Sequence, residues 1–348
     1  MEAWDLLVDR GDLRRWRLAA IDPAPALAEG EVMLEVERFA LTANNVTYGA
    51  AGDSLGYWKF FPAPAGQGRI PVWGFARVTA SRAAGAPQGL RLFGYWPMST
   101  HLVARLEKTS RGFVETSAHR ADLPPTYNAY VEAPEDALDD YRALLRPLLM
   151  TSFLLDDQLS ETRLDGLVLS SASSKTAMGL AWLARRRGVK LIGLTSPAHL
   201  DLLRGLGLYD EVVGYGDIGR ISAKGPLAYV DFAGRSDVTG AVHATLGEAL
   251  VQSLIVGLTH WQSMGGPPQT VGPKPVFFFA PDRIRQRMKD WGAETLTARF
   301  DAALRDFIAA NPWLTLQTHV GADSLTDLYA QVVAGAVSPD HGHIVRPR

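Results

Sequence analysis

The stretch LDGLVLSSASSKTAMGLAWLARRRG, residues 164–188, decides the fold. It begins with a mainly apolar stretch at 164–169, interrupted by Asp165, which is typical of a strand buried on both faces of a parallel sheet. A turn of small polar residues follows at 170–175, and an alanine-rich helix then extends to Arg187. Three arginines and Gly188 close this helix, because cations favour the negative end of the helix dipole and glycine suits the C-cap. The stretch therefore predicts a strand–turn–helix unit.

The same alternation of helix and strand continues on both sides of this unit. Short links between such units predict a parallel, doubly wound sheet, because right-handed crossovers return each strand to the same sheet. A helix over 137–154 precedes the unit, and we expect Pro147 to break or kink it. The further expected elements are strands at 189–194, 211–214, 227–231 and 253–258 and a helix at 197–206.

The first third of the chain has the pattern of a β-rich domain. Residues 32–39 alternate apolar and polar side chains like a half-buried strand. Short apolar stretches at 70–78, 90–95 and 101–106 are separated by glycine and proline, which is typical of a small barrel or sandwich. The proline-bearing segment 122–126 marks the point where this texture ends.

Length, charge and cysteine content restrict the possible functions. At roughly 150 residues per domain, 348 residues predict two domains. The 35 basic and 37 acidic residues give a net charge of −2, which argues against nucleic acid or an anionic membrane as the main partner. The absence of cysteine excludes disulfides, thiolate catalysis and zinc sites with sulfur ligands. The start lacks a signal-peptide pattern and no apolar run approaches the roughly 18 residues of a membrane span, so we expect a soluble, cytoplasmic protein.

The turn at 170–175 is the first candidate binding site. In a doubly wound sheet, the N–H groups at the start of the first helix can hold a phosphate anion. The glycines of a dinucleotide fingerprint fall on Ser171, Ser174 and Ala177, which are all small although none is glycine. Such a turn can approach a pyrophosphate, provided that no residue in it needs a positive φ. The alternative is an ordinary small-residue turn that binds no ligand.

A Walker A loop is a rival interpretation of the same turn. Ser174, Lys175 and Thr176 resemble its Gly-Lys-Thr ending, and 227–231 resembles a Walker B strand. The two Walker glycines fall on Leu169 and Ser174, however, and a buried leucine cannot cradle phosphate. We therefore favour the dinucleotide interpretation, in which Lys175 faces a phosphate as a point charge or is simply solvated.

The end of the second strand indicates which dinucleotide would bind. A carboxylate at this place would bind the ribose 2′-hydroxyl of NAD. The sequence instead offers the hydroxyls of Thr195 and Ser196 and the nearby imidazole of His199, which suit a 2′-phosphate better. Ser196 taken alone could equally be the N-cap of the following helix.

Five segments carry a resemblance to a known superfamily. They are the early strand at 30–36, the LTANN segment at 41–45, the IPVWGF segment at 70–75, the turn at 171–179 and the DFAG segment at 231–234. With a β-rich domain first and a dinucleotide-type domain second, the chain resembles the zinc-independent branch of the medium-chain dehydrogenases and reductases. Within that branch of quinone oxidoreductases and enoyl reductases, it is most similar to a side family described as a domain of unknown function.

The resemblance implies a domain plan and a cofactor. A GroES-like β-barrel domain would span residues 1–127, completed by about 336–348, and a Rossmann-type domain would span 128–335. NADPH would be the cofactor. His199 replaces a lysine that binds the 2′-phosphate in relatives, Tyr215 takes the place of a tyrosine at the same phosphate, and Gly257 is a further cofactor contact. By analogy with similar folds, we expect a homodimer.

Chemistry without a metal favours an activated substrate. Hydride addition to a conjugated enone or a quinone needs only hydrogen-bond donors at the oxygen that becomes an enolate. The candidate proton donors are Tyr48, which follows the LTANN segment, and Tyr57, in the aromatic loop at 52–68, with Asn44 and Asn45 as orienting residues. Alternatively, the asparagines cap a turn and the tyrosines fill gaps. The predicted function is an NADPH-dependent reductase of small activated C=C or quinone substrates, and the alternative is a pseudo-enzyme or binding module on the same scaffold.

Two other groups of residues carry weaker hypotheses. His341 and His343 are close together but have no third ligand at a recognisable spacing, so we expect no metal site. The basic run at 283–289 predicts a solvated helix face, or a site for an acidic substrate if its side chains converge.

Overall fold

The computed structural model describes residues 3–222, 225–256 and 270–348. The chain forms two compact units, of which the first comprises Met1–Leu144 and Leu314–Arg348 and the second comprises Leu145–Trp313. The first unit thus extends beyond the domain expected at 1–127, and the chain returns to it earlier than residue 336.

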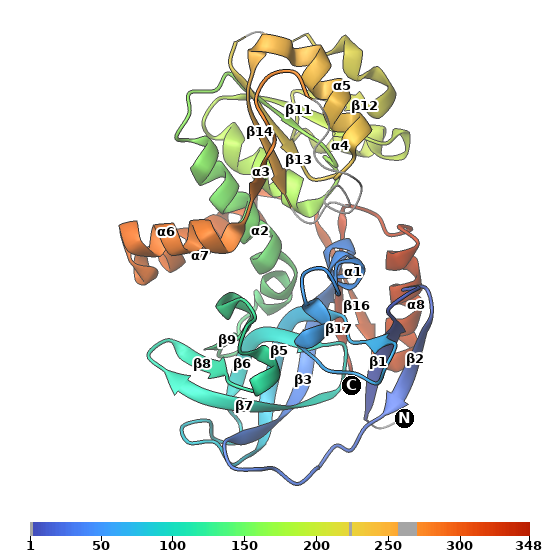
Figure 1. Cartoon of the computed structure of the whole chain (residues 1–348), viewed down its shortest axis with the longest axis vertical. Helices are drawn as coiled ribbons and strands as arrows, with labels where there is room; N and C mark the ends of the chain where they lie inside the picture. Colours follow the sequence, from blue (N-terminus) through green and yellow to red (C-terminus); the bar gives the residue numbers. More distant parts are fainter. Residues whose placement is uncertain (1–2, 223–224, 257–269) are drawn as a thin grey trace. The chain divides into compact units, whose positions relative to one another are not determined.

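The first unit is built on a closed β-barrel (Figure 1). Its strands pair in the order β3-β5-β6-β9-β8-β7, and β7 also pairs with β3, so that six strands form a ring. Closure leaves no unpaired strand edge in the ring. The strands are β3 (Glu31–Leu41), β5 (Pro71–Ser81), β6 (Arg91–Pro97), β7 (His101–Thr109), β8 (Gly112–Glu115) and β9 (Ala129–Glu132).

Further strands and helices complete this unit. β17 pairs with β3 and carries β16 on its other side, while β2, β1 and β4 form a separate three-stranded sheet. These strands are β1 (Trp4–Asp9), β2 (Trp16–Ala20), β4 (Gln67–Gly68), β16 (Thr315–Val320) and β17 (His341–Arg346). The helices are α1 (Ala43–Ala50), α8 (Gly321–Val333) and the short 3-10 helices η1 (Tyr57–Lys59), η2 (Ala118–Arg120) and η3 (Pro125–Tyr127).

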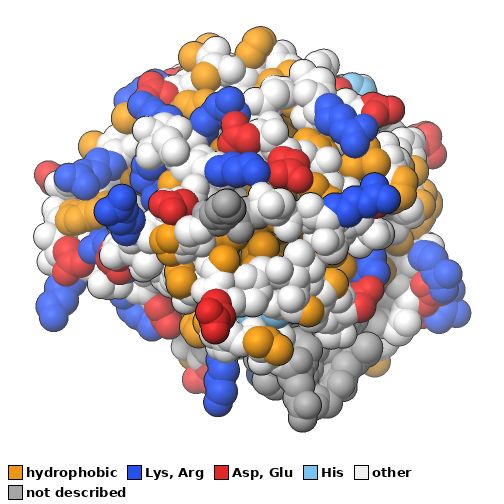
Figure 2. Space-filling model, turned by 90° about the horizontal axis from the view of Figure 1, so that it is seen from above, with side chains coloured by type: hydrophobic (Ala, Val, Ile, Leu, Met, Phe, Trp, Pro, Cys, Tyr) orange, Lys and Arg blue, Asp and Glu red, His pale blue; other side chains and the backbone are white. Residues whose placement is uncertain are grey.

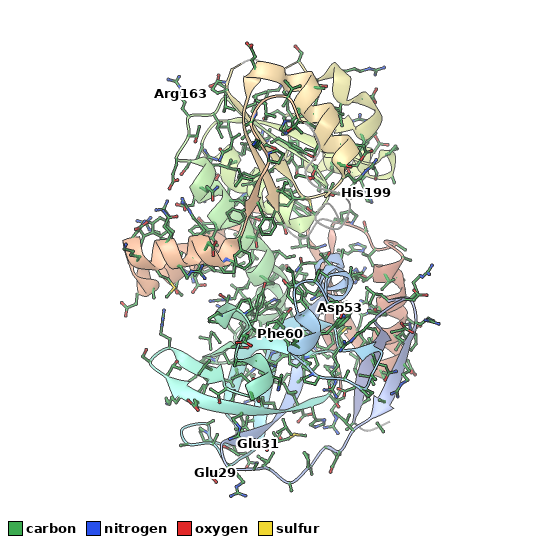
Figure 3. The ribbon with its side chains drawn as sticks, in the orientation of Figure 1. Glu29, Glu31, Asp53, Phe60, Arg163 and His199 are labelled. Carbon is green, nitrogen blue, oxygen red and sulfur yellow. The ribbon has the colours of Figure 1, made fainter. Side chains whose placement is uncertain are left out.

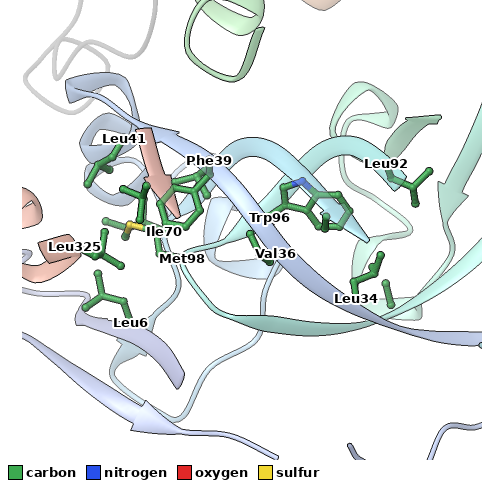
Figure 4. Close-up of a cluster of buried hydrophobic side chains, with 14 of the residues drawn as sticks. Leu6, Leu34, Val36, Phe39, Leu41, Ile70, Leu92, Trp96, Met98 and Leu325 are labelled. Carbon is green, nitrogen blue, oxygen red and sulfur yellow. The ribbon is translucent and has the colours of Figure 1, made fainter. Parts of the chain in front are cut away.

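A single apolar cluster joins the barrel to these additions. Alternate residues of β3, including Leu34 and Val36, point into it and are fully buried. Leu6 of β1, Trp96 of β6 and Leu325 of α8 meet them there, as Figure 4 shows. The period-two pattern predicted for 32–39 is therefore confirmed as the inner face of a barrel strand.

The second unit is a doubly wound parallel sheet. Its strands lie in the order β12-β11-β10-β13-β14-β15 and every pairing is parallel. Numbered along the chain, this is the order 3-2-1-4-5-6 of a Rossmann fold, with the change of direction between β10 and β13. The strands are β10 (Gly166–Leu169), β11 (Lys190–Thr195), β12 (Glu211–Gly214), β13 (Leu227–Asp231), β14 (Leu250–Val256) and β15 (Val276–Phe278).

Helices cover both faces of this sheet. Leu167 and Leu169 of β10 face one buried cluster, and Val168 faces another that includes Val238 and Val242. Burial on both faces explains the unbroken apolar strands, so the predicted fold class is confirmed. The helices are α2 (Asp139–Leu159), α3 (Lys175–Arg185), α4 (Leu200–Leu206), α5 (Ser236–Leu246), α6 (Ala280–Trp291), α7 (Ala293–Ala310) and the 3-10 helices η4 (Pro197–His199), η5 (Tyr215–Arg220) and η6 (Gly247–Ala249).

Pro147 was expected to break or kink the helix, and the break is wrong, because α2 continues through this residue. Leu148 and Leu149 are buried directly after the proline. Their packing outweighs the one backbone hydrogen bond that proline cannot make.

The helices and the surface bear on possible partners. None of the helices in the described part of the chain is long and apolar enough to cross a membrane. On the face shown in Figure 2, Lys and Arg side chains are interspersed with Asp and Glu rather than gathered into one basic region.

Candidate functional site

The first βα turn, residues 170–174, contains a strained serine. Ser171 has φ +43° and is the only non-glycine residue with positive φ in the described ranges. Its backbone N–H donates to the hydroxyl of Tyr215 at 2.9 Å. The sequence-based condition that no residue of this turn needs a positive φ is therefore wrong at the first fingerprint position. A left-handed conformation of a residue other than glycine costs about 1–3 kcal/mol.

The rest of the turn closes the start of α3. Ser174 is the N-cap residue, and its Oγ accepts a hydrogen bond from the backbone N–H of Ala177 at 3.2 Å. Ala177 is completely buried. Lys175 and Thr176 form the first two positions of the helix and are half-buried. The small residues at the fingerprint positions thus begin a helix whose N-terminus can face an anion.

Three side chains from two turns meet beside this helix. The Nδ1 atom of His199 lies 3.2 Å from Oγ of Ser173 and 3.4 Å from Oγ of Ser196 (Figure 3 labels His199). Ser196 occupies the N-cap position of η4, but its hydroxyl makes no capping hydrogen bond. Thr195, at the end of β11, is buried. The structure therefore brings His199 and Ser196 together as predicted and adds Ser173, which sequence reasoning missed.

A buried carboxylate fixes the place where the strand order changes direction. Asp231, at the end of β13, accepts a hydrogen bond from Ser170 Oγ at 2.6 Å. The same carboxylate accepts from the backbone N–H groups of Ala233 and Gly234, at 2.9 Å and 3.1 Å, and from Thr239 Oγ1 at 3.2 Å. These hydrogen bonds join the carboxyl ends of β10 and β13. Ser170 was not singled out from the sequence, because nothing in a strand-end serine indicates its partner.

The structure describes Tyr215, one of the predicted cofactor residues, but not Gly257, another. Tyr215 follows β12, and the guanidinium carbon of Arg235 lies 5.3 Å from the centre of its ring. Its hydroxyl faces the turn, through Ser171, in this structure. Gly257 lies outside the described residues, so its cofactor contact stays a prediction.

Both predicted catalytic tyrosines belong to one aromatic cluster of the first unit, formed by Tyr48, Tyr57, Trp73, Tyr95 and Tyr127. The rings of Tyr48 and Tyr57 are centred 4.7 Å apart, and the hydroxyls of Tyr57 and Tyr127 lie 3.4 Å apart. Tyr95 lies 4.9 Å from Tyr127 and also 4.9 Å from Trp73, centre to centre. Phe60, labelled in Figure 3, closes one side of the cluster with its ring 5.3 Å from that of Tyr95.

The phenols of this cluster are hydrogen-bond donors at neutral pH. Burial raises the pKa of Tyr48 and of Tyr57 well above the ordinary value of a phenol. The neighbouring side chains of Trp73 and Asn44 oppose this rise at Tyr48. Burial likewise raises the pKa of Tyr95 and of Tyr127, and the nearby phenols add to the effect. A group that keeps its proton in this way suits proton donation rather than base catalysis.

The two asparagines differ in their surroundings. Asn45 is buried, and its Oδ1 accepts from the backbone N–H and the hydroxyl of Thr42 at 2.8 Å and 3.0 Å. Its Nδ2 donates to the carbonyl oxygen of Pro71 at 2.9 Å. Asn45 therefore caps α1, as the alternative interpretation stated, while Asn44 is half-buried beside Tyr48.

The other candidate groups of the sequence form internal contacts. His319 of β16 joins His343 of β17, with Nε2 and Nδ1 3.1 Å apart. The part of the chain that the structure describes holds no cluster of three or more His, Asp or Glu placed to bind a metal ion. In the basic run, Arg283 and Arg287 each donate through Nε to Asp157, at 2.6 Å and 2.7 Å. These two arginines thus stabilise the packing of α6 on α2 and are neither a solvated face nor a site for an acidic substrate.

Trp73, Tyr95 and Tyr127 were missed by sequence reasoning. Trp73 and Tyr95 face each other in the register of β5 and β6, and Tyr127 ends η3 after two prolines. Pairing between strands cannot be obtained from one sequence without knowing the register, so no local signal identified them.

A GroES-like barrel followed by a Rossmann-type sheet is the fold of the medium-chain dehydrogenases and reductases. CurA from Vibrio vulnificus, also solved in complex with NADPH, is 14% identical, with a TM-score of 0.67 and 99% of each chain covered. Mycobacterial Rv1454c, complexed with NADPH, is 14% identical at a TM-score of 0.62, covering 99% of this chain and 100% of its own. A putative NADPH:quinone reductase from Bacillus thuringiensis is 16% identical at 0.61, covering 99% and 98%. These likenesses establish the fold.

The sequence itself places the chain in a family. Residues 39–338 match the model of the family described as protein of unknown function (DUF2855), and the chain belongs to that family. A search of curated proteins finds no match.

Proposed function

We propose that this protein is an NADPH-dependent reductase that transfers a hydride to an activated C=C bond or a quinone. The observation that carries the proposal is the group formed by Ser173, Ser196 and His199 beside the start of α3. Two hydroxyls and an imidazole there can hydrogen-bond a 2′-phosphate, and the adjoining end of β11 has no carboxylate to repel it. Neighbours of the same fold that are solved with NADPH support this choice.

The residues of the second unit fit a dinucleotide in shape. Ser174 and Ala177 place no bulky side chain at the start of α3, so a pyrophosphate can lie against the helix N-terminus. Lys175 stands at the first helical position as a cation for the same group. When bound, NADPH supplies the hydride.

The residues of the first unit fit the proton side of the reaction. Tyr48 and Tyr57 keep their protons at neutral pH because both are buried, and either can donate to an enolate. Asn44, beside Tyr48, orients the phenol, and Asn45 holds the helix that carries both residues. Replacing the donating tyrosine by phenylalanine should lower turnover by about 10²–10⁴ while NADPH binding is kept. Full activity of both Tyr48→Phe and Tyr57→Phe would end this assignment.

A pseudo-enzyme is the second candidate, and one observation favours it. Ser171 donates its N–H to Tyr215, and the N–H of Ala177 is taken by the Ser174 hydroxyl. Both donors belong to the turn that would face a pyrophosphate. In a binding module that no longer binds a dinucleotide, these N–H groups would be hydrogen-bonded within the protein in this way.

Calorimetric titration with NADPH and NADH separates the two candidates. The reductase should bind NADPH at least tenfold more tightly than NADH, a difference of about 1.4 kcal/mol. NADPH should also raise the melting temperature by mass action. Ser173→Ala and Ser196→Ala should weaken NADPH but not NADH, whereas Ser160→Ala, whose hydroxyl is bonded to the Asp157 carbonyl, is the matched control. Equal affinities, or no binding of either dinucleotide, contradict the proposal.

A further inference from the structure

The aromatic cluster contains two buried donors that no described residue uses. The indole Nε1 of Trp73 and the hydroxyl of Tyr95 are inaccessible to solvent and make no hydrogen bond of normal geometry in the described part of the chain, although the Trp73 side chain lies close enough to the Tyr48 hydroxyl to lower the pKa of that phenol. The two residues are direct neighbours across β5 and β6, with ring centres 4.9 Å apart. An unpartnered buried donor destabilises the folded state, so such groups commonly mark a place that a ligand completes.

The surroundings indicate the shape of the missing partner. Trp73, Tyr95 and Tyr127 present three aromatic rings whose centres are 4.9–6.0 Å apart. Trp73 and Tyr127 are only half-buried, so the cluster is open to a ligand at these two residues. Aromatic faces at this spacing suit a planar conjugated molecule.

The charges near the cluster indicate that the partner is neutral. Arg120 is the cation that acts on Tyr95, and it lies 3.0 Å from Glu115. Its guanidinium also donates to the Phe60 carbonyl and to the hydroxyl of Tyr130, each at 3.0 Å. Arg120 is thus fully engaged, and a carboxylate or phosphate entering the cluster would gain no free counter-charge from it.

We propose that Trp73 and Tyr95 donate hydrogen bonds to one carbonyl oxygen of a planar, uncharged quinone or conjugated enone. The role of these donors in the reaction rests on the proposed reductase function, whereas the binding of the carbonyl compound does not. An indole N–H can only donate, so its partner must be an acceptor such as a carbonyl oxygen. Tyr48 and Tyr57 adjoin the same group, since the ring of Tyr48 is centred 5.8 Å from that of Tyr95.

The two donors would act on charge that develops during the reaction. Hydride adds to the carbon β to the carbonyl, and the π electrons of the C=C bond move onto the carbonyl oxygen, which becomes an enolate. A phenol, Tyr48 or Tyr57, then supplies a proton, and water restores the proton to the phenol. Substrate is reduced by two electrons and NADPH is oxidised by two. Donors already aimed at the oxygen stabilise the enolate more than the ground-state carbonyl.

The test uses two substitutions that remove the donors. Tyr95→Phe loses only the hydroxyl, whereas Trp73→Phe also loses the five-membered ring of the indole. In Trp73→Phe and Tyr95→Phe, turnover of duroquinone or cyclohexenone with NADPH should fall by about 10²–10³ for each lost donor. Affinity for NADPH should not change. The melting temperature of Tyr95→Phe should not fall, because the lost hydroxyl has no partner among the described residues. A melting temperature that falls with no change in turnover would show a purely structural role and overturn the inference.

Trp96→Phe is the matched control in the same barrel. The Nε1 of Trp96 donates to the carbonyl oxygen of Gly74 at 2.9 Å, so this variant also loses an indole donor, but a satisfied one. It should lower the melting temperature, while turnover per folded molecule is kept. Equal loss of turnover in Trp96→Phe and Trp73→Phe would contradict a specific role for Trp73.

A binding measurement without NADPH distinguishes failure of the inference from failure of the reductase function. Wild-type protein should bind duroquinone more tightly than durene, which has the same ring and methyl groups but no oxygen. This comparison needs no variant and therefore does not depend on a variant's folding. Oxygen-dependent binding that Trp73→Phe weakens, without any NADPH oxidation, would keep the inference and reject the reductase. NADPH-dependent reduction that is equal in wild type and both variants would reject the inference and keep the reductase function.

Discussion

The first βα turn of the second unit and the aromatic cluster of the first unit both bring polar side chains to a candidate site, but they differ in how those groups are satisfied. In the turn, Ser170 donates a hydrogen bond to the Asp231 carboxylate, and both side chains accept hydrogen bonds from backbone N–H groups after β13. In the cluster, the donors of Trp73 and Tyr95 have no partner among the described residues. The hydrogen bonds of Ser170 and Asp231 are thus made within the protein, although the neighbouring Tyr229 hydroxyl has no partner among the described residues, whereas neither of these two donors of the cluster has a partner.

The difference separates polar groups that hold the fold from those available to a ligand. A satisfied network fixes one backbone geometry, here the strand ends where a dinucleotide would lie. An unsatisfied donor costs stability in the free protein and regains it on binding. Substitutions that remove a hydrogen-bonding side chain should therefore have different effects in the two regions. In the turn they should lower stability, and in the cluster they should lower turnover without loss of stability.

The largest effect is expected for Asp231→Ala. This change leaves Ser170, Thr239 and the backbone N–H of Gly234 without their acceptor, while the N–H of Ala233 keeps its second acceptor, Ser170 Oγ. Each buried donor left unsatisfied costs about 1–3 kcal/mol, so the free energy of unfolding should fall by about 3 kcal/mol or more. Urea denaturation of the purified variant measures the loss.

Asp231→Asn is the control for this prediction. The amide keeps one acceptor oxygen and the side-chain shape, so its loss should be clearly smaller than that of Asp231→Ala. Equal, small losses in both variants would show that the network is not what fixes the end of β13.

The second prediction concerns alkaline pH and the buried phenols. Burial raises the pKa of Tyr57 and of Tyr95 in the folded state, so the native protein holds more protons than the unfolded chain above about pH 10. Stability is therefore fully present below about pH 10 and falls above it, by about 1.4 kcal/mol per pH unit for each such phenol. Urea titrations at increasing pH should show this fall, with a smaller slope in Tyr57→Phe.

A tyrosine of the second unit sharpens the comparison. Tyr209 is buried, which raises its pKa as well, but its hydroxyl donates to the carbonyl oxygen of Ala172 at 2.7 Å. Tyr209→Phe should lower stability already at neutral pH, whereas Tyr95→Phe should not. If the two variants behaved alike at neutral pH, hydrogen-bond satisfaction would not be what distinguishes the two regions.

The sequence predicts the fold far better than the site, for a physical reason. Strands 211–214 and 227–231 coincide with β12 and β13, and all five residues of β13 are buried, as expected for a strand covered on both faces. Only part of the group around His199 could be predicted from the sequence. Ser196 and His199 lie in one turn, whereas Ser173 comes from another. The break expected at Pro147 is absent because tertiary packing outweighs a local signal.

The aromatic cluster shows what local patterns cannot supply. Tyr48 and Tyr57 were candidates because they follow a recognisable segment, yet Trp73 and Tyr95 enter the cluster only through the pairing of β5 with β6. The strain at Ser171 was equally hidden, because a small polar residue gives no indication of the sign of its φ.

The third prediction tests the group around His199. A lysine ammonium is fully charged at pH 8 and attracts a phosphate as a point charge. His199→Lys should therefore tighten NADPH binding at pH 8 by about tenfold, or about 1.4 kcal/mol, and leave NADH unchanged. Calorimetric titration of both dinucleotides measures the effect. An equal gain for NADH would mean that the new charge acts on the pyrophosphate and not on a 2′-phosphate.

The smallest effect is expected for Ser171→Gly, and it tests the turn directly. Glycine adopts φ +43° without the steric cost that serine bears, although its unfolded chain has more conformational freedom to lose. The balance should raise the free energy of unfolding by about 0.5–1 kcal/mol, because the hydrogen bond from the backbone N–H to Tyr215 is kept. Ser171→Ala keeps the strain and should bring no gain. A loss of stability in Ser171→Gly would mean that the serine hydroxyl holds the turn and that this region, too, depends on a contact the backbone does not supply.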